Sequence, residues 1–159
     1  MAKSKDSDSN SRQAISNRKA YHDYEILEKY EAGIELRGTE VKAIRGGFAN
    51  LRDNYAQITH GELWVHNLHI SPYKHGNIMN HEPLRPRRLL LHKREIMRLI
   101  GKTQEKGLTL IVLRLYWKGN YLKAEIGLCR GKKQHDKRAA IAERDVKRQI
   151  ERAVRRDLE

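Results

Sequence analysis

Histidines and neighbouring acidic residues are the side chains of this sequence with the chemistry for metal binding or acid–base catalysis. The chain contains eight histidines and one cysteine. His66 and His69 are three residues apart in a segment predicted to be a strand, which places them on opposite faces, and no cysteine accompanies them. Their spacing argues against a zinc site, and we expect neither a metal ion nor a cofactor.

His22 and Asp23 form an adjacent pair of a kind that could transfer protons. The sequence offers neither a nucleophile elbow nor a glycine-rich phosphate loop to give this pair a catalytic role. Cys129 has no second cysteine for an internal disulfide, so we interpret it as a small packing residue. We expect a protein that is not an enzyme.

A large excess of positive charge suggests binding instead of catalysis. The 33 Lys and Arg residues outnumber the 20 Asp and Glu residues, which gives a formal net charge of +13. A field of this sign attracts polyanions, and nucleic acid is the expected partner. A membrane surface is the alternative, but no stretch approaches the roughly 18 apolar residues of a spanning helix, and no apolar signal-peptide core follows the polar start. We therefore expect a cytoplasmic protein with no membrane partner.

Alternating apolar residues predict several antiparallel strands that would position these charges. One strand includes Tyr24 and Tyr30 and leads to a bend or bulge at Gly33, and two more lie between residues 51 and 72 with a turn at 59–62. Residues 108–117 and 121–128 form a predicted hairpin. The pattern predicts a mainly β fold, a small antiparallel β-barrel of the oligonucleotide-binding (OB) type with two or three short helices.

The first short helix is expected at residues 40–45. Thr39 is predicted to cap its first turn, and Gly46 to close it in the left-handed conformation. Lys42 and Arg45 are three residues apart and therefore point to the same side of this helix. They form either a solvated face or a phosphate clamp.

A second helix follows a long surface loop predicted at residues 73–86. Ile96, Leu99 and Ile100 share one face of this helix, which we expect to pack on the barrel. Gly101 is predicted to end the helix.

The two ends of the chain carry few core residues. We expect residues 1–16 to form a disordered arm, 17–130 the RNA-binding barrel and 131–159 a basic tail. Apolar residues recur in the tail at helical spacing, but the stripe is narrow and built partly of alanine. The tail is therefore predicted to be disordered when free and helical when bound; the alternative is a helix that docks on the barrel.

Six short runs of the sequence, in this order, resemble the bacterial SsrA-binding protein (SmpB) family. They are residues 17–20, 31–34, 38–42, 70–73, 87–91 and 131–138. The resemblance implies an adaptor that binds the tRNA-like domain of transfer-messenger RNA (SsrA) and delivers it, with elongation factor Tu, to stalled ribosomes for trans-translation. A general RNA-binding barrel and an RNA enzyme such as a nuclease are the alternatives, and we expect a monomer.

The resemblance also implies which barrel residues bind RNA. Asn17, Glu31 and Leu90 match family positions implicated in holding the RNA, and Lys123 matches a basic one. A carboxylate repels phosphate, so Glu31 is expected to accept a hydrogen bond from a base or sugar, or to orient a neighbouring cation. The complete predicted set is Asn17, Arg18, Lys19, Glu31, Lys42, Arg45, Leu90 and Lys123.

For the tail, the resemblance implies entry into the ribosomal decoding centre and the empty mRNA channel, where it folds as a helix. Gly131 matches a hinge, and His135 matches a residue expected to stack on a decoding-centre nucleotide. The predicted ribosome-contacting residues are Gly131, Lys132, Lys133, His135, Asp136, Lys137 and Arg138.

Overall fold

A computed structural model describes residues 14–73, 80–105, 107–132 and 134–157. Most of the expected N-terminal arm, at residues 1–13, and residues 74–79 of the expected loop lie outside this range. Among the residues described, no helix is both long and apolar enough to cross a bilayer.

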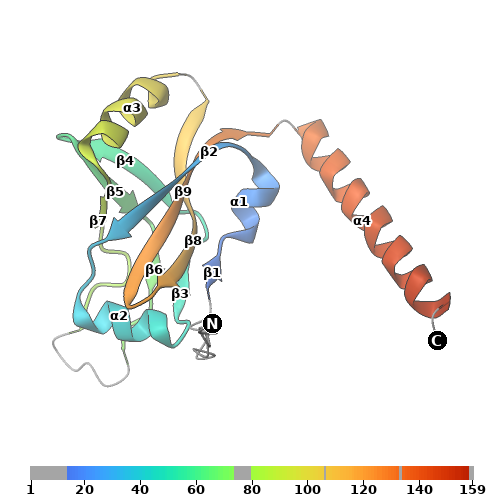
Figure 1. Cartoon of the computed structure of the whole chain (residues 1–159), viewed down its shortest axis with the longest axis horizontal. Helices are drawn as coiled ribbons and strands as arrows, with labels where there is room; N and C mark the ends of the chain where they lie inside the picture. The colour runs from blue at the N-terminus through green and yellow to red at the C-terminus, as the bar shows by residue number, and fades with distance from the viewer. Residues whose placement is uncertain (1–13, 74–79, 106, 133, 158–159) are drawn as a thin grey trace, which may run out of the picture.

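A closed antiparallel barrel forms the body of the protein (Figure 1). Its seven-stranded sheet has the order β1-β8-β4-β5-β7-β2-β9, and an additional pairing of β8 with β9 closes the ring. The strands are β1 (Ile15–Ser16), β2 (Tyr24–Ile34), β4 (Tyr55–Thr59), β5 (Glu62–His66), β7 (Arg87–Leu90), β8 (Leu108–Lys118) and β9 (Tyr121–Gly131). Strands β3 (Ala49–Asn50) and β6 (His69–Ile70) form a separate two-stranded sheet. The predicted mainly β barrel is confirmed.

Strand β8 is buried on both faces over residues 110–113, which explains the dense run of apolar residues there. Leu110 and Val112 point into the barrel core, whereas Ile111 and Leu113 pack with Cys129 under helix α1 (Arg18–Asp23). Cys129 is fully buried, which confirms its expected packing role, and burial raises the pKa of its thiol to about 11. The predicted β8–β9 hairpin is confirmed.

The barrel begins two residues earlier than expected. Ile15 and Ser16, assigned to a disordered arm, form β1 and pair with Leu115 and Arg114 of β8. The polar sequence around Ile15 and Ser16 gives no sign of this pairing. A two-residue strand forms only because a distant strand, here β8, supplies its hydrogen-bond partners.

Strand β2 differs from expectation at Gly33. The register shift in its pairing with β9 lies between Ile26 and Glu28, so the predicted bulge at Gly33 is wrong. Gly33 instead pairs with Leu90 on one side and Lys123 on the other. A Cβ atom at Gly33 would lie 3.3 Å from the Cβ of Leu90, so glycine here permits close packing.

Helix α2 (Gly38–Arg45) starts and ends differently from the prediction. Arg37 is its N-cap residue and donates its backbone N–H to Glu40 Oε1 (2.9 Å). Thr39 is not the cap, since its hydroxyl hydrogen-bonds His81 Nδ1 (2.9 Å) within the first turn. The left-handed conformation falls on Gly47 (φ +79°), not on Gly46 (φ −79°).

Helix α3 (Lys93–Thr103) packs on the barrel through Leu99, which is fully buried. Ile96 and Ile100 are half-buried on the same side, as predicted. The helix continues past Gly101, so the predicted stop is wrong. Glycine costs only about 1 kcal/mol inside a helix, and here packing of the preceding turn outweighs it.

The predicted turn at 59–62 is confirmed, with His60 and Gly61 in the left-handed region (φ 51° and 74°) between β4 and β5. His66 and His69 do not share a strand, because Asn67 (φ 59°) separates β5 from β6. His66 stacks on Tyr55 with ring centroids 5.2 Å apart. The described residues contain no group of three metal-binding side chains.

Helix α4 (Gln134–Asp157) follows β9 and projects away from the barrel (Figure 1). Helices α2 and α3 lie at opposite ends of the barrel in the same view. One of these helices therefore lies at each end of the barrel, α1 packs over part of the outer face of β8 and β9, and the side chains of residues 141–156 of α4 are exposed.

Candidate nucleic-acid interface

Three predicted RNA-binding residues meet at an open pocket of about 650 Å³. Glu31 comes from β2, Leu90 from β7 and Lys123 from β9. The pairing of Gly33 with both Leu90 and Lys123 brings these distant parts of the sequence together. Leu90 is 47% exposed although it is apolar, so the pocket offers an uncharged surface beside a lysine.

The carboxylate of Glu31 is held by two donors from β8. It accepts hydrogen bonds from the Tyr116 hydroxyl and from Lys118 Nζ (3.2 Å). These bonds, that of Tyr116 first, lower the pKa of Glu31. Burial and the bond to Glu31 raise the pKa of Tyr116 to about 12. Glu31 is therefore ionised and Tyr116 neutral at physiological pH, and the carboxylate, which itself lines the pocket, orients a neighbouring hydroxyl and ammonium group.

Lys42 and Arg45 are exposed on the same side of α2, as their spacing predicts. Lys42 Nζ lies 5.4 Å from the ring centroid of Tyr73, and the Arg45 guanidinium lies 5.5 Å from that of Trp117. Stacking on a ring restrains a long side chain while its N–H groups remain able to bind an anion. Both the solvated face and the phosphate clamp fit this geometry.

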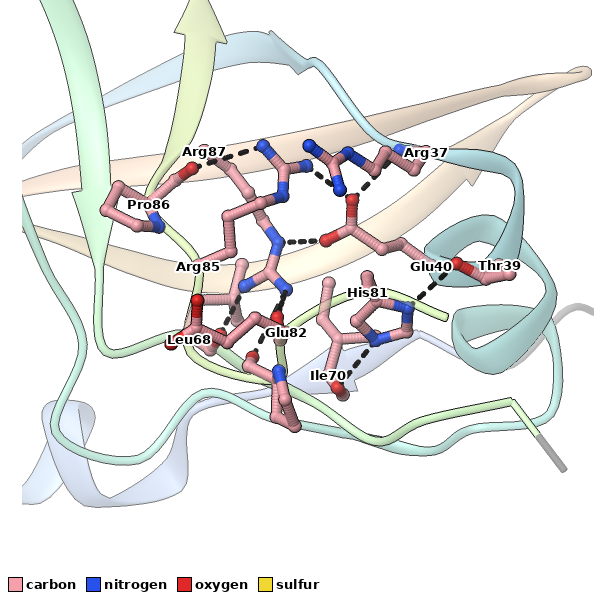
Figure 2. Close-up of polar contacts among 11 residues, drawn as sticks. Arg37, Thr39, Glu40, Leu68, Ile70, His81, Glu82, Arg85, Pro86 and Arg87 are labelled. Atoms are coloured by element: carbon pink, nitrogen blue, oxygen red, sulfur yellow. Dashed lines mark hydrogen bonds and ion pairs between the residues drawn. The ribbon is translucent and has the colours of Figure 1, made fainter. Parts of the chain in front are cut away.

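A buried ion cluster fixes α2 to the start of β7 (Figure 2). Glu40 is fully buried and accepts hydrogen bonds from Arg85 Nη2 and Arg87 Nε, in addition to the backbone N–H of Arg37. Burial by itself raises the pKa of Glu40, but the three hydrogen bonds outweigh it and the net shift is downward. From the sequence Glu40 is only the first residue of the expected helix, and its contacts with Arg85 and Arg87 were missed.

Arg87 extends the cluster to the segment that precedes β7. Its guanidinium is fully buried and donates to the carbonyls of Leu68 and Pro83, the latter at 3.1 Å. His81 Nε2 donates to the carbonyl of Ile70 (2.8 Å). Arginines directly before an apolar run were visible in the sequence, but their partner Glu40 lies 45 and 47 residues away. The cluster sets where Leu90 and α2 lie relative to each other.

Residues 17–19 do not line the Glu31 pocket. Asn17 is buried, caps α1 by accepting from Ala20 N (3.1 Å), and donates to the Leu51 carbonyl (3.0 Å). Lys19 is exposed and forms an ion pair with Asp53 (2.8 Å), and Arg18 is exposed beside it. Asn17 thus shapes the backbone here, whereas the side chains of Arg18 and Lys19 are open to a partner.

The tail begins where β9 ends. Gly131 pairs with Tyr24 at the last position of the β2–β9 ladder, and α4 starts at Gln134. Lys137 Nζ lies 3.7 Å from Asp23 Oδ1, and Arg138 is exposed. Lys133 lies outside the described residues, and only the backbone positions of His135 and Asp136 in α4 are described.

The apolar stripe of α4 has no partner among the barrel residues that the structure describes. Its larger residues are all more than two-fifths exposed; they are Ile141, Val146, Ile150 and Val154. The docked arrangement considered from the sequence is therefore not the one found. Whether the tail is disordered in the free protein stays a prediction.

Residues 14–156 match the model of the family described as SmpB protein. The chain belongs to the SmpB family. Curated relatives named SsrA-binding protein include that of Carboxydothermus hydrogenoformans, 68% identical over 87% of this chain and 93% of the relative. That of Desulforudis audaxviator is 60% identical over 87% of this chain and 91% of the relative. The resemblance seen in the six runs is confirmed.

A solved structure described as "tmRNA-SmpB: a journey to the center of the bacterial ribosome" is similar in fold. The two chains are 48% identical, superpose with a TM-score of 0.66, and align over 80% of this chain and 94% of that one. The SmpB family match extends from β1 to within α4. Barrel and tail thus belong to one family unit, and the tail is not an unrelated appendage.

Proposed function

We propose that this chain is an RNA-binding adaptor that binds the tRNA-like domain of transfer-messenger RNA and delivers it to stalled ribosomes for trans-translation. The observation that carries the proposal is the SmpB family match over residues 14–156. The relatives named SsrA-binding protein and the tmRNA–SmpB structure support it.

The Glu31 pocket is the proposed RNA-binding site of the barrel. Leu90 supplies an exposed apolar surface on which a base can lie, while Lys123 and Lys118 supply charge for the phosphates. Glu31 itself holds the Tyr116 hydroxyl and the Lys118 ammonium group in place. Although its own charge repels phosphate, it thus helps RNA binding by orienting these two hydrogen-bond donors. Lys42 and Arg45 extend the same positive surface over α2, with Arg18 and Lys19 as further contacts.

The tail is the proposed ribosome-binding element. Gly131 acts as the hinge, the Lys and Arg residues at 132–138 bind ribosomal RNA, and His135 stacks on a decoding-centre nucleotide. The exposed apolar stripe of α4 gains a partner when the helix lies in the mRNA channel. The adaptor works as a monomer in the cytoplasm, alongside elongation factor Tu, and catalyses no reaction itself.

Reconstituted trans-translation tests the proposal. The purified chain, added with transfer-messenger RNA and elongation factor Tu to ribosomes stalled on a message without a stop codon, should support tagging of the nascent peptide. No tagging above the reaction lacking the chain would reject the proposal.

Two further assays separate the alternative functions. A general RNA-binding barrel would bind bulk RNA as well as the tRNA-like domain, so competition at moderate salt should show a clear preference for the latter. A nuclease would degrade RNA during prolonged incubation with divalent metal, whereas we expect the RNA to stay intact.

A further inference from the structure

The end of α1 contacts the start of the tail at two backbone carbonyls. Lys132 donates its backbone N–H to the carbonyl of Asp23 (3.0 Å). The side chain of Lys132 reaches the carbonyl of Tyr21, with Nζ at 3.4 Å. A cation at a helix C-terminus is favourable, because the carbonyls there have no partner within the helix. The first residue after β9 is therefore held by both its backbone and its side chain.

The carboxylate of Asp23 adds a third contact, one turn into the tail helix. Asp23 Oδ1 lies 2.8 Å from His22 Nδ1 and 3.7 Å from Lys137 Nζ. The hydrogen bond with His22 lowers the pKa of Asp23, and the charge of Lys137 acts in the same direction. The carboxylate is thus ionised at neutral pH. The His22–Asp23 pair, for which the sequence suggests no catalytic role, lies at the end of α1 beside the first residues of the tail.

We propose that the end of α1 is a clasp that sets the direction in which the tail leaves the barrel, with Asp23 as its positioning residue. The clasp consists of Tyr21 and Asp23 on α1 and of Lys132 and Lys137 in the tail. The proposed function assigns these two lysines to the ribosome, and the clasp explains how they are presented before they reach it.

The orientation of the tail relative to the barrel must be set by contacts beyond Gly131, because a glycine side chain cannot restrain it. Gly131 pairs with Tyr24 through its backbone, but among the residues that the structure describes no atom lies within 4 Å of a Cβ built at Gly131, so no side chain there restrains the chain that follows. Lys132 and Lys137 are five residues apart and are both tied to α1, which restrains the orientation of the first turns of α4. Restraining a binding segment in advance lowers the entropy lost on binding.

The strength of the clasp suits a reversible contact. The Asp23 and Lys137 side chains are 23% and 31% exposed, and solvated pairs of this kind are weak. Phosphate groups of ribosomal RNA present the same negative charge as the Asp23 carboxylate, so they can take over Lys137 when the tail arrives. The clasp biases the direction of the free tail without locking it.

Spin labels report the clasp in the intact chain. Cysteines introduced by Gln57→Cys on β4 and Ala139→Cys near the base of α4 can be labelled selectively, because the native Cys129 is buried and its pKa is raised to about 11. The label at 139 lies near the base, so the readout does not depend on whether the distal helix is formed. Pulsed EPR then gives the distribution of distances between barrel and tail.

Asp23→Asn removes the charge but keeps the backbone carbonyl that binds Lys132. The equilibrium constant between the clasped and the released tail should fall about 1.5- to fivefold, the range for a weak ion pair, and the distance distribution should broaden accordingly. Glu62→Gln is the matched control, since it breaks an exposed ion pair with Arg88 (3.1 Å) elsewhere on the barrel. An unchanged distribution for Asp23→Asn, or equal broadening for the control, would overturn the proposal.

Exchange of the two charges tests the pairing directly. Asp23→Lys and Lys137→Asp should each broaden the distribution, and the double variant should restore it. A double variant as broad as the single ones would show that the two side chains act independently, which contradicts the clasp.

A tagging assay tests what the clasp contributes to the reaction, and this arm alone rests on the proposed function. Asp23→Asn should lower the tagging rate about 1.5- to fivefold, while its affinity for the tRNA-like domain stays unchanged. A broadened distribution with unchanged tagging would reject the contribution to the reaction. If the parent chain gave no tagging, the proposed function would fail, and the EPR result would still decide the clasp.

Discussion

Two glutamates of the fold have opposite environments and therefore different tasks. Glu31 is exposed, lines a pocket and accepts hydrogen bonds from Tyr116 and Lys118. Glu40 is fully buried between two arginines, where a carboxylate without counter-ions would be strongly unfavourable. Substitution of the first should change binding, and substitution of the second should change folding.

Glu31→Gln should weaken RNA binding without destabilising the barrel. The amide keeps an acceptor for Tyr116 but loses the charge that holds Lys118, so that lysine samples more orientations. We expect affinity for the tRNA-like domain to fall about three- to tenfold, measured by filter binding at fixed salt. Glu62→Gln serves as the control for loss of a surface carboxylate. An unchanged affinity would remove Glu31 from the RNA-binding set.

Glu40→Gln should destabilise the fold by about 3–5 kcal/mol, because it leaves buried Arg87 without its counter-ion. The pKa of Glu40 is lowered in the folded state, so its contribution is present above the ordinary value of 4.5 and is lost as the pH falls through the folded-state pKa. The parent chain should therefore lose more stability in acid than the variant does. Urea unfolding followed by circular dichroism at neutral and acidic pH measures both effects; a change under about 1 kcal/mol at neutral pH contradicts the cluster's role.

At the scale of elements, substitutions on α2 can show whether Lys42 and Arg45 form a phosphate clamp. Lys42→Ala and Arg45→Ala should each reduce the salt dependence of RNA binding by about one unit of slope and weaken binding to all RNA sequences alike. The paired control is Lys93→Ala with Arg94→Ala, two exposed cations on α3. If both pairs reduced the slope equally, the α2 cations would be ordinary contributors to the net charge.

The elements found from the sequence are those with strong local signals. The β8–β9 hairpin has a run dense in β-forming residues before a Gly-Asn turn, and α3 carries its apolar face at helical spacing. The predicted helix stop at Gly101 and the predicted cap at Thr39 were wrong because tertiary contacts outweighed the local preference of each residue. The Glu40–Arg87 cluster was invisible because it joins residues 47 positions apart, a contact that only the closed sheet creates.

The candidate site likewise depends on contacts between distant parts of the sequence. Glu31, Leu90 and Lys123 were proposed from resemblance alone, and no local pattern relates them. Their meeting at one pocket follows from the pairing of β2 with both β7 and β9. The buried position of Asn17 and the contacts of Asp23 with the tail depend equally on distant strands, so neither could be read from spacing.

At the scale of the whole molecule, the barrel and the tail are separable in structure. All the strands described end by Gly131, and the side chains of residues 141–156 of α4 are all exposed. Residues 132–159 hold ten Lys and Arg against six Asp and Glu, which is +4 of the total +13. Most of the positive charge therefore stays with the barrel when the tail is removed.

Truncation after Gly131 should accordingly separate the two tasks. The shortened chain keeps every strand and the Glu31 pocket, so its affinity for the tRNA-like domain should fall by less than about tenfold, through the loss of tail charge. Tagging should be abolished, because nothing remains to enter the decoding centre.

His135→Ala should reduce tagging less than truncation does, since stacking contributes only about 1–3 kcal/mol per base. Filter binding and reconstituted tagging, run in parallel on the two variants and the parent, measure this difference. A truncated chain that lost RNA binding together with tagging would show that the tail helps to hold the RNA, and the two-part division of the molecule would have to be abandoned.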